Sequence, residues 1–239
     1  MSTEYKKIAF HTMGCKQNYS ETSRISTDFV NRGFEKVTYK EYADFYVLNT
    51  CSVTDNADKE ARKLIRQAKR SNPNAKIAVI GCYAQLNPEE ISNIKGVDLV
   101  VGSENKFNLL NELDRLDLNG GSKVVRSNIK ETSSFIPSYS IGDRTRSYLK
   151  LQDGCDYVCS FCTIPLARGK SRSDSIKKTI DLANQAINEG AKELVLTGVN
   201  IGDFGKQTNE SFFDLIKELD NLDVLRLRIS SIEPNLLTK

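Results

Sequence analysis

The sequence lacks any apolar run of about eighteen residues, so we expect no transmembrane helix. The first residues, Met-Ser-Thr-Glu-Tyr-Lys-Lys, lack the apolar core of a signal peptide, which makes a cytoplasmic protein the default expectation. Net charge is also small, at +3, so binding of nucleic acid would require a local concentration of basic residues. There is a single histidine, His11, which limits metal sites built on imidazole.

Cysteine is the informative residue of this chain. With 239 residues, 39% hydrophobic and 27% charged, the composition is that of a globular protein of one large or two ordinary domains. Six cysteines in a chain without an export signal favour metal or catalytic roles over disulfides. Three of them are about thirty residues apart, and the other three lie within eight positions.

The N-terminal part alternates strands and helices, which implies βαβ units and a parallel sheet. We therefore predict an α/β fold with a doubly wound N-terminal domain over residues 4–118. Strands are expected at 7–13, 44–49, 76–80 and 97–101, and helices at 20–32, 56–70, 88–94 and 107–116.

Residues 119–143 are rich in Gly, Ser and Thr and predict a linker, with one short strand at 123–125. The alternation resumes over a second domain, residues 144–239. Strands are expected there at 148–152, 193–197 and 224–230, with helices at 173–189 and 211–219.

The crowded cysteines, Cys155, Cys159 and Cys162, form a Cys-x3-Cys-x2-Cys pattern directly after a predicted strand. Three thiolates cannot close a tetrahedral zinc site, and nothing places His11 nearby as a fourth ligand. A [4Fe–4S] cluster can use three thiolates and leave one iron open for a substrate. Three buried thiols, or a zinc knuckle completed from elsewhere, are the alternatives.

The spaced cysteines, Cys15, Cys51 and Cys82, each come just after a predicted strand. In a doubly wound sheet the carboxyl ends of neighbouring strands face one crevice, where ligands bind. We therefore expect the three thiols to meet at one edge of the sheet. The alternative is three separate buried cysteines, which are common core residues.

Several segments together resemble the methylthiotransferase family of radical S-adenosylmethionine enzymes, and they run through nearly the whole chain in the order of that family. They are Gly14-Cys-Lys-Gln-Asn18, Asn49-Thr-Cys-Ser-Val53, Gly81-Cys-Tyr-Ala84, Leu151-Gln-Asp-Gly-Cys155 and Cys162-Thr-Ile-Pro165, followed by Ala167-Arg-Gly-Lys-Ser-Arg-Ser173.

The resemblance implies two [4Fe–4S] clusters, one on Cys15, Cys51 and Cys82 and one on Cys155, Cys159 and Cys162. The second set implies the catalytic centre, where the cluster and S-adenosylmethionine generate a 5′-deoxyadenosyl radical. It also implies S-adenosylmethionine contacts from one aromatic residue beside the last cysteine and from residues after the next two strands. The alternative for the aromatic residue is core packing, and the alternative for the others is an ordinary loop. These residues are Phe161, Gly198, Asn200, Ser231 and Glu233.

Three branches of the family compete for this chain. They modify isopentenyladenosine in tRNA, threonylcarbamoyladenosine in tRNA, or an aspartate of a ribosomal protein. The first motif here, Gly-Cys-Lys-Gln-Asn, is similar to the Gly-Cys-Lys-Val-Asn of the threonylcarbamoyladenosine branch and departs from it at Gln17. We therefore expect a methylthiotransferase acting at position 37 of tRNA, supplied by an electron donor whose identity the sequence does not reveal, without a membrane or DNA partner.

Basic residues fit an RNA partner such as the anticodon stem-loop. Arg168, Lys170 and Arg172 follow the crowded cysteines, where we expect them to hold phosphates. Six more basic residues lie on the helix expected at 56–70, where they form either a solvated face or phosphate contacts. They are Lys59, Arg62, Lys63, Arg66, Lys69 and Arg70.

The resemblance implies a barrel of about six βα units and an RNA-binding β domain after it. Only three barrel strands are legible before Lys239, so we expect a truncated radical S-adenosylmethionine barrel whose last strand has an unpaired edge. A non-catalytic iron–sulfur remnant of such an enzyme is the alternative to an active one.

Overall fold

A computed structural model of the chain describes residues 6–51, 55–116, 121–140 and 146–237. Parts of the predictions lie outside these ranges: residues 52–53 of the second motif, and parts of the domains and linker at 4–5, 117–120, 141–145 and 238–239. The chain forms two compact units. The first comprises residues 1–18 and 25–129, and the second comprises residues 19–24 and 130–239.

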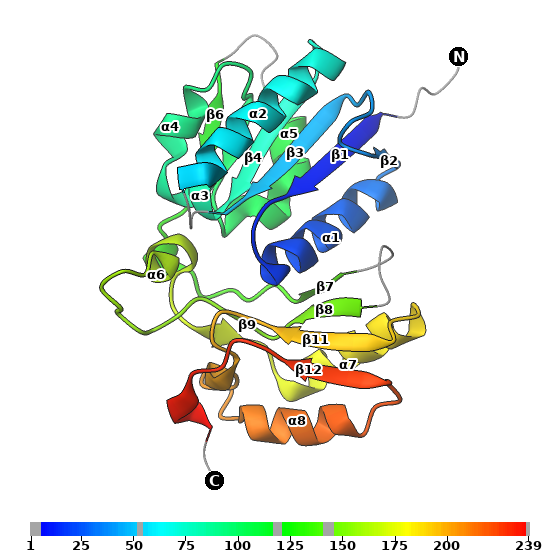
Figure 1. Ribbon diagram of the computed structural model, residues 1–239, viewed down its shortest axis with the longest axis vertical. Helices are drawn as coiled ribbons and strands as arrows, with labels where there is room; N and C mark the ends of the chain where they lie inside the picture. Colours follow the sequence, from blue (N-terminus) through cyan, green and yellow to red (C-terminus); the bar gives the residue numbers. More distant parts are fainter. Residues whose placement is uncertain (1–5, 52–54, 117–120, 141–145, 238–239) are drawn as a thin grey trace. The chain divides into compact units, whose positions relative to one another are not determined.

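Six parallel strands form the sheet of the first unit, in the order β2-β1-β3-β4-β5-β6 (Figure 1). This sheet confirms the predicted α/β fold. The strands are β1 (Lys7–Thr12), β2 (Glu35–Val37), β3 (Phe45–Thr50), β4 (Lys76–Gly81), β5 (Leu99–Val101) and β6 (Lys123–Val125).

Helices cover both faces of this sheet because successive strand residues point to opposite sides. One face packs Tyr46, Leu48 and Val79 under α2, α3 and α4, and the other packs Val47 and Ile80 under α1 and α5. The helices are α1 (Lys16–Asn31), α2 (Asp55–Ser71), α3 (Cys82–Leu86), α4 (Pro88–Ser92) and α5 (Leu109–Asp114), the last preceded by the 3-10 turn η1 (Asn105–Asn108).

Helix α1 begins four residues before its predicted start at residue 20. Its first turns bury the polar side chains of Gln17, Asn18, Ser20 and Glu21, so they lack the apolar periodicity by which helices are recognised in a sequence. β2 also escaped prediction, because it has three residues, two of them exposed and charged.

The residues predicted as a linker, 119–143, are divided between the two units. β6 completes the first sheet, whereas β7 (Ser138–Tyr139) belongs to the second unit, and the turn η2 (Ile129–Glu131) lies between them in sequence.

The second unit holds a four-stranded sheet in the order β12-β11-β8-β7. Its three long strands are parallel, and β7 pairs antiparallel with β8. They are β8 (Arg146–Lys150), β11 (Glu193–Thr197) and β12 (Arg226–Ile229), and a separate antiparallel pair is formed by β9 (Gln152–Asp153) and β10 (Arg172–Ser173).

Two helices follow the long strands and pack on the second sheet through Ala183, Ala186, Leu215 and Leu219. They are α7 (Ile176–Asn188) and α8 (Phe212–Asp220); the unit also contains α6 (Ile164–Arg168) and the turns η3 (Ile201–Asp203) and η4 (Pro234–Leu236). Strand, helix and strand alternate as the sequence predicted. None of the helices in the described ranges is long and apolar enough to cross a membrane.

Candidate functional site

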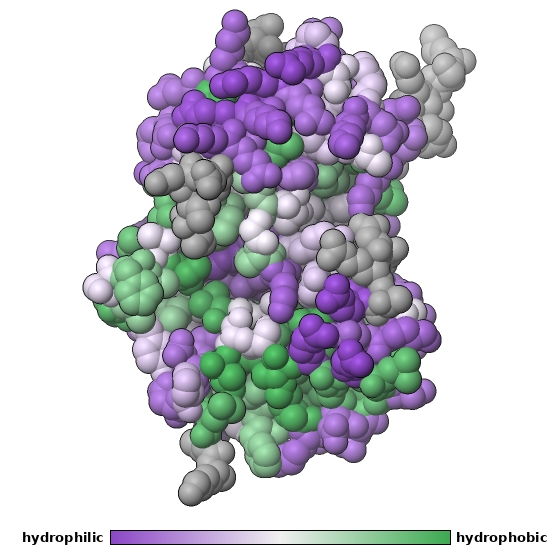
Figure 2. Space-filling model, in the orientation of Figure 1, coloured by the Kyte–Doolittle hydropathy of each residue, from purple (hydrophilic) through white to green (hydrophobic). Residues whose placement is uncertain are grey.

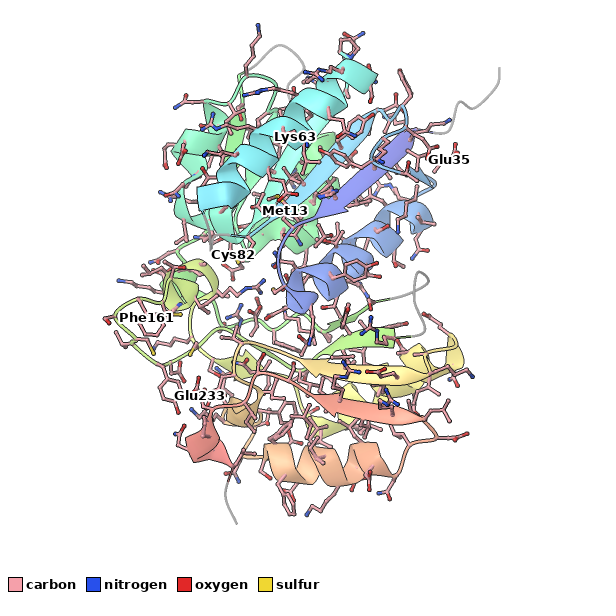
Figure 3. The ribbon with its side chains drawn as sticks, in the orientation of Figure 1. Met13, Glu35, Lys63, Cys82, Phe161 and Glu233 are labelled. Atoms are coloured by element: carbon pink, nitrogen blue, oxygen red, sulfur yellow. The ribbon has the colours of Figure 1, made fainter. Side chains whose placement is uncertain are left out.

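The spaced cysteines follow three neighbouring strands of the first sheet. Cys15 comes after β1, Cys51 after β3 and Cys82 after β4, and these strands pair in parallel. Their carboxyl ends therefore lie at one edge of the sheet, where Figure 3 labels Met13 and Cys82. This edge includes the point between β1 and β3 where the strand order reverses, which is where doubly wound sheets bind ligands.

Glycine and asparagine shape this edge. Gly14 has φ +88°, and a Cβ there would lie 2.5 Å from Cys51 Cβ and 2.8 Å from Cys51 Sγ, so Cys51 packs directly against it. The Asn18 side-chain amide donates to Met13 O and Thr50 O, both at 3.0 Å. Asn18 thereby ties the segment after β1 to the end of β3.

The three thiols at this edge differ in exposure. Cys15 is exposed, Cys51 is half-buried and Cys82, the first residue of α3, is buried. Thiols of graded exposure on adjoining strand ends are a donor set that suits an iron–sulfur cluster seated at a surface edge.

The crowded cysteines lie on a loop after β9 in the second unit. Cys159 is exposed, and Cys155 and Cys162 are half-buried. The loop is closed by the Cys155 N–H, which donates to Gly169 O at 3.0 Å, and by the Cys162 N–H, which donates to Cys159 O at 3.1 Å. All three thiols are thus on one small loop with solvent access, which excludes the alternative of three buried thiols.

Burial raises the pKa of the Cys155 thiol, and the nearby Asp203, Cys162 and Asp156 raise it further. A thiolate here therefore needs a compensating cation. Within the described part of the chain, no three His, Cys, Asp or Glu side chains could hold a metal ion. Three thiolates on one loop can hold a four-iron cluster and leave its fourth iron without a protein ligand.

Gln152 joins this loop to the segment that follows β11, and its side chain is fully buried. Its amide nitrogen donates to Gly154 O at 2.7 Å and to Ser171 Oγ at 2.9 Å. Its amide oxygen accepts from the N–H groups of Val199 and Asn200, both at 2.9 Å.

The residues that the resemblance implied as S-adenosylmethionine contacts come together in part. Asn200 Oδ1 accepts from the Glu233 N–H at 3.2 Å, and the Ile201 N–H donates to Ser231 O at 3.0 Å. Gly198 lies against Gln152, since a Cβ on it would be 3.0 Å from the Gln152 backbone and side-chain oxygens. The ends of β11 and β12 therefore meet beside the cysteine loop.

Three further details bear on ligand binding. The Asn200 side-chain nitrogen is buried and, within the described ranges, has no hydrogen-bond partner. Ser231 has φ +50°, a strained conformation typical of functional loops. Phe161 is 89% exposed, which excludes its alternative as a core residue.

The phosphate-binding role expected for Arg168 and Arg172 is wrong. Arg168 is 1% and Arg172 is 5% exposed, so neither guanidinium can reach an RNA backbone. Arg168 contacts Glu21 at 3.1 Å and Asp153 at 2.9 Å, and Arg172 contacts Asp153 at 3.1 Å. The carboxylate partners are distant in sequence, which is why the run Arg-Gly-Lys-Ser-Arg looked like a basic patch.

These arginines hold the base of the cysteine loop instead. Arg172 donates to Arg168 O at 2.6 Å and to Lys170 O at 3.0 Å, and Asp153 accepts from the Gly154 N–H at 2.9 Å. Lys150 completes the buried cluster by contacting both Glu21 and Asp153. Of the three expected cations, Lys170 is the exposed one.

A pocket of about 690 Å³ adjoins the loop and is lined by Cys155, Tyr157, Val158 and Lys170, among others. Sequence reasoning missed Gln152, Asp153 and Glu21 as supports of this site. Gln152 and Asp153 stood inside a quoted motif, but nothing in the sequence pointed to Glu21.

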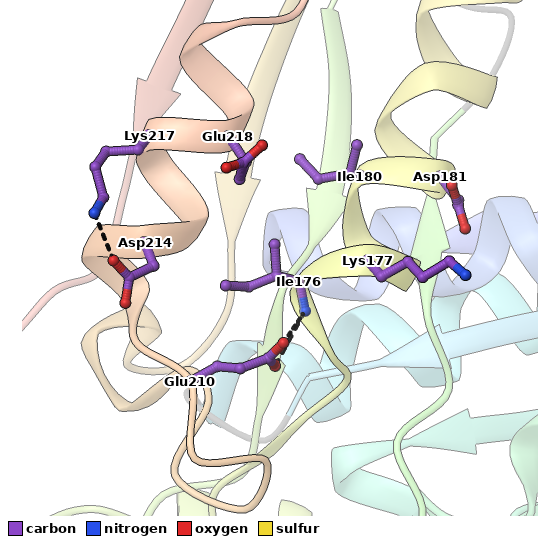
Figure 4. A pocket seen from close by; sticks show the side chains of 8 residues that line it. All are labelled: Ile176, Lys177, Ile180, Asp181, Glu210, Asp214, Lys217 and Glu218. Atoms are coloured by element: carbon purple, nitrogen blue, oxygen red, sulfur yellow. Dashed lines mark hydrogen bonds and ion pairs between the residues drawn. The ribbon is translucent and has the colours of Figure 1, made fainter.

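A second pocket, of about 480 Å³, lies between α7 and α8 (Figure 4). Its charged groups serve the helices: Glu210 accepts from the Ile176 N–H at the start of α7, and Asp214 pairs with Lys217. We do not assign it to the site.

The chain is similar in sequence to several known proteins. Residues 7–102 match the model of the uncharacterized protein family UPF0004. Proteins named threonylcarbamoyladenosine tRNA methylthiotransferase MtaB are 43% identical in Bacillus subtilis (strain 168), 39% in Aquifex aeolicus (strain VF5) and 36% in Thermotoga maritima. These alignments cover 97%, 95% and 95% of this chain and 52%, 56% and 52% of those proteins. The chain thus spans about half the length of the curated relatives it matches.

Among solved structures, the radical S-adenosylmethionine methyltransferase TsrM from Kitasatospora setae, determined with cobalamin and a [4Fe–4S] cluster bound, has a TM-score of 0.59. The match covers 90% of this chain and 52% of that one at 13% identity, and it therefore shows a shared fold.

Proposed function

The chain is a sequence relative of the methylthiotransferases, and from this premise we propose that it belongs to a radical S-adenosylmethionine enzyme. Its reaction adds a 2-methylthio group to N6-threonylcarbamoyladenosine at position 37 of tRNA. The observation that carries the proposal is the exposed three-cysteine loop, joined through Gln152 to the ends of the neighbouring strands.

Cys155, Cys159 and Cys162 hold a [4Fe–4S] cluster in this proposal. When bound, the cluster supplies the electron that cleaves the sulfonium of S-adenosylmethionine. The chain's own task is to fix the loop: Gly154, with φ +72°, sits so close to the backbone at Gly169 and Lys170 that a side chain there would collide with it.

Asn200 is the best-supported contact to S-adenosylmethionine. Its buried side-chain nitrogen has no acceptor among the residues that the structure describes, and an unpaired buried donor is costly unless a ligand accepts from it. The carboxylate of the methionine moiety is such an acceptor. Glu233 and Ser231 flank the same turn, Gly198 allows close approach, and Phe161 offers an exposed ring to stack on adenine.

Cys15, Cys51 and Cys82 hold the second [4Fe–4S] cluster, which carries or donates the sulfur. Their place at the carboxyl edge of the first sheet leaves Cys15 exposed, as delivery of sulfur to a large substrate requires. In the second unit we assign β8, β11 and β12 to a radical S-adenosylmethionine barrel, in keeping with their parallel pairing.

The division of labour between the two sets gives a direct test. A single turnover with dithionite and S-adenosylmethionine should form 5′-deoxyadenosine in reconstituted protein. Cys159→Ala should abolish this product, whereas Cys51→Ala should keep it and, in the full-length enzyme, lose methylthio transfer. No 5′-deoxyadenosine from a cluster-loaded wild-type sample would indicate a non-catalytic iron–sulfur fragment instead.

The substrate is tested in cells that carry a full-length homologue with these motifs. Deletion should remove the 2-methylthio group from threonylcarbamoyladenosine of the anticodon stem-loop, as measured by mass spectrometry of digested tRNA. Loss from isopentenyladenosine, or from a ribosomal-protein aspartate, would assign the chain to a sister branch.

A further inference from the structure

Helix α2 separates its basic residues into two groups. Its buried side packs Ala61, Leu64, Ile65 and Ala68 on the first sheet. Two of its cations are engaged: Arg62 pairs with Glu90 at 3.3 Å, and Lys69 donates to Ala75 O at 2.7 Å. These two serve the first unit itself.

The other four cations are Lys59, Lys63, Arg66 and Arg70, and all are exposed. Their spacing of four, three and four residues places them on one face of the helix. Across the described ranges of the chain, no ion pair or hydrogen bond engages any of them. We call this set the cationic stripe; Figure 2 colours the surface over α2 strongly hydrophilic, and Figure 3 labels Lys63 there.

The stripe is long and continuous. At 1.5 Å of rise per residue it extends about 16 Å along α2. One strand of a double helix carries on the order of five phosphates over that length, at about 3.4 Å each. The four cations thus match a short stretch of nucleic-acid backbone.

The stripe also begins near the functional edge of its own unit. α2 follows β3 in the chain, and Cys51 lies directly after β3. Lys59 lies in the first turns of α2, so it is the cation of the stripe nearest in the chain to Cys51. The other three cations lie progressively farther along the helix from the edge that carries Cys15, Cys51 and Cys82. A backbone lying on α2 would have one end directed at that edge.

We propose that the cationic stripe of α2 is a docking surface for the phosphate backbone of RNA. The choice of RNA as the polyanion that binds here rests on the proposed function. Like charges three and four residues apart repel one another, so the stripe disfavours its own helix until an anion binds. A purely solvated face would gain from interspersed acidic partners, whereas Glu60 is the one exposed acid among the residues from Lys59 to Arg70.

An RNA fits this surface better than an acidic protein does. Protein interfaces have an apolar core, with charged residues depleted at its centre. Of the exposed large hydrophobic residues in the described ranges, none lies on α2. Recognition there must be electrostatic and independent of sequence, as phosphate contacts are.

The experiment compares two variants of the full chain that have equal net charge. The first replaces the stripe: Lys59→Gln, Lys63→Gln, Arg66→Gln and Arg70→Gln. The matched control replaces four exposed lysines that do not form a row: Lys36→Gln, Lys40→Gln, Lys177→Gln and Lys192→Gln. Binding of a fluorescein-labelled anticodon stem-loop RNA is followed by anisotropy over a salt series, and circular dichroism confirms that both variants fold.

The stripe variant should lower the slope of log affinity against log salt by about three, at roughly 0.7 to 0.9 per lost phosphate contact. The control should retain the wild-type slope to within about one. Photo-crosslinked RNA should map to α2 peptides in the wild-type chain.

Equal slopes for the two variants, with RNA bound, would overturn the docking surface and leave the proposed function standing. If the wild-type chain binds no RNA at any salt yet forms 5′-deoxyadenosine, the docking surface is likewise overturned and the radical chemistry stands. Failure of both measurements would overturn the two proposals together.

Discussion

Gly14 and Gly33 have nearly the same positive φ, +88° and +93°. They differ in surroundings, because a Cβ on Gly14 would collide with Cys51, whereas a Cβ on Gly33 would meet nothing within 4 Å. The pair therefore separates the cost of a positive φ from the cost of displacing a cysteine.

Gly33→Ala should lower the free energy of unfolding by about 1–2 kcal/mol, the cost of a left-handed conformation for a residue with a Cβ, and should leave iron binding unchanged. Gly14→Ala should carry the same cost and also reduce the iron held by the first cysteine set. Iron binding is measured as iron per chain after anaerobic reconstitution, and stability is measured as the midpoint of thermal unfolding. Equal iron contents in both variants would show that Cys51 does not depend on Gly14.

Gln152 makes a second prediction at the scale of one residue. Gln152→Glu keeps the oxygen that accepts from Val199 and Asn200 but loses the amide donors to Gly154 O and Ser171 Oγ. It also introduces a carboxyl beside the buried Asp153. We expect unfolding to become easier by about 1–3 kcal/mol per orphaned group, and iron to leave the loop faster.

Gln207→Glu is the matched control for this change, because Gln207 is exposed and donates to Ser171 O at 3.3 Å. It should alter neither stability nor iron retention by more than the experimental error. A Gln152→Glu chain that retains iron like Gln207→Glu would remove Gln152 from the supports of the loop.

At the scale of elements, buried charges connect residues 19–24 of α1 with β8, β9, α6 and β10, all within the second unit. Glu21, Lys150, Asp153, Arg168 and Arg172 form one cluster with side chains at most 6% exposed. Such a cluster adds little net stability compared with apolar packing. The loss of one member, however, leaves the remaining charges buried without a partner and without water.

Arg168→Met should therefore lower the free energy of unfolding by about 3–5 kcal/mol, because Glu21 and Asp153 would both lose a buried partner. Arg115→Met is its control, since Arg115 is 69% exposed and contacts Glu112 at 3.5 Å. That change should cost less than about 1 kcal/mol. Urea denaturation of both variants measures the free energy of unfolding. Equal decreases in the two variants would contradict the assignment of Arg168 to a structural cluster.

At the scale of the whole molecule, the two cysteine sets belong to separate compact units. Each set should therefore assemble its cluster without the other. Reconstituted wild-type protein should bind about eight irons, from two four-iron clusters.

Replacing Cys155, Cys159 and Cys162 with Ala should halve the iron content and leave the other set loaded. Replacing Cys15, Cys51 and Cys82 should have the reciprocal effect. Iron and sulfide analysis of the two triple variants is the measurement, and complete loss of iron from either one would refute independent sites.

The sequence by itself determined the alternation of strands and helices, the parallel sheets and the placement of cysteines after strand ends. Apolar periodicity and chain order suffice for these features, because they are local and repeat over many residues. The resemblance to the methylthiotransferases, and not periodicity, singled out Gly198, Asn200, Ser231 and Glu233. It did not give the hydrogen bond that joins Asn200 to Glu233.

Only the tertiary structure decided which charges are free. Arg168 and Arg172 look alike in sequence to Lys63 and Arg66, yet the first two are buried against carboxylates and the second two face solvent. Glu21 lies 147 residues from Arg168 in the chain, and no local pattern specifies a partner at that separation. A charge is neutralised or exposed by its neighbours in space, so the residues available to an RNA backbone became evident only when the chain was folded.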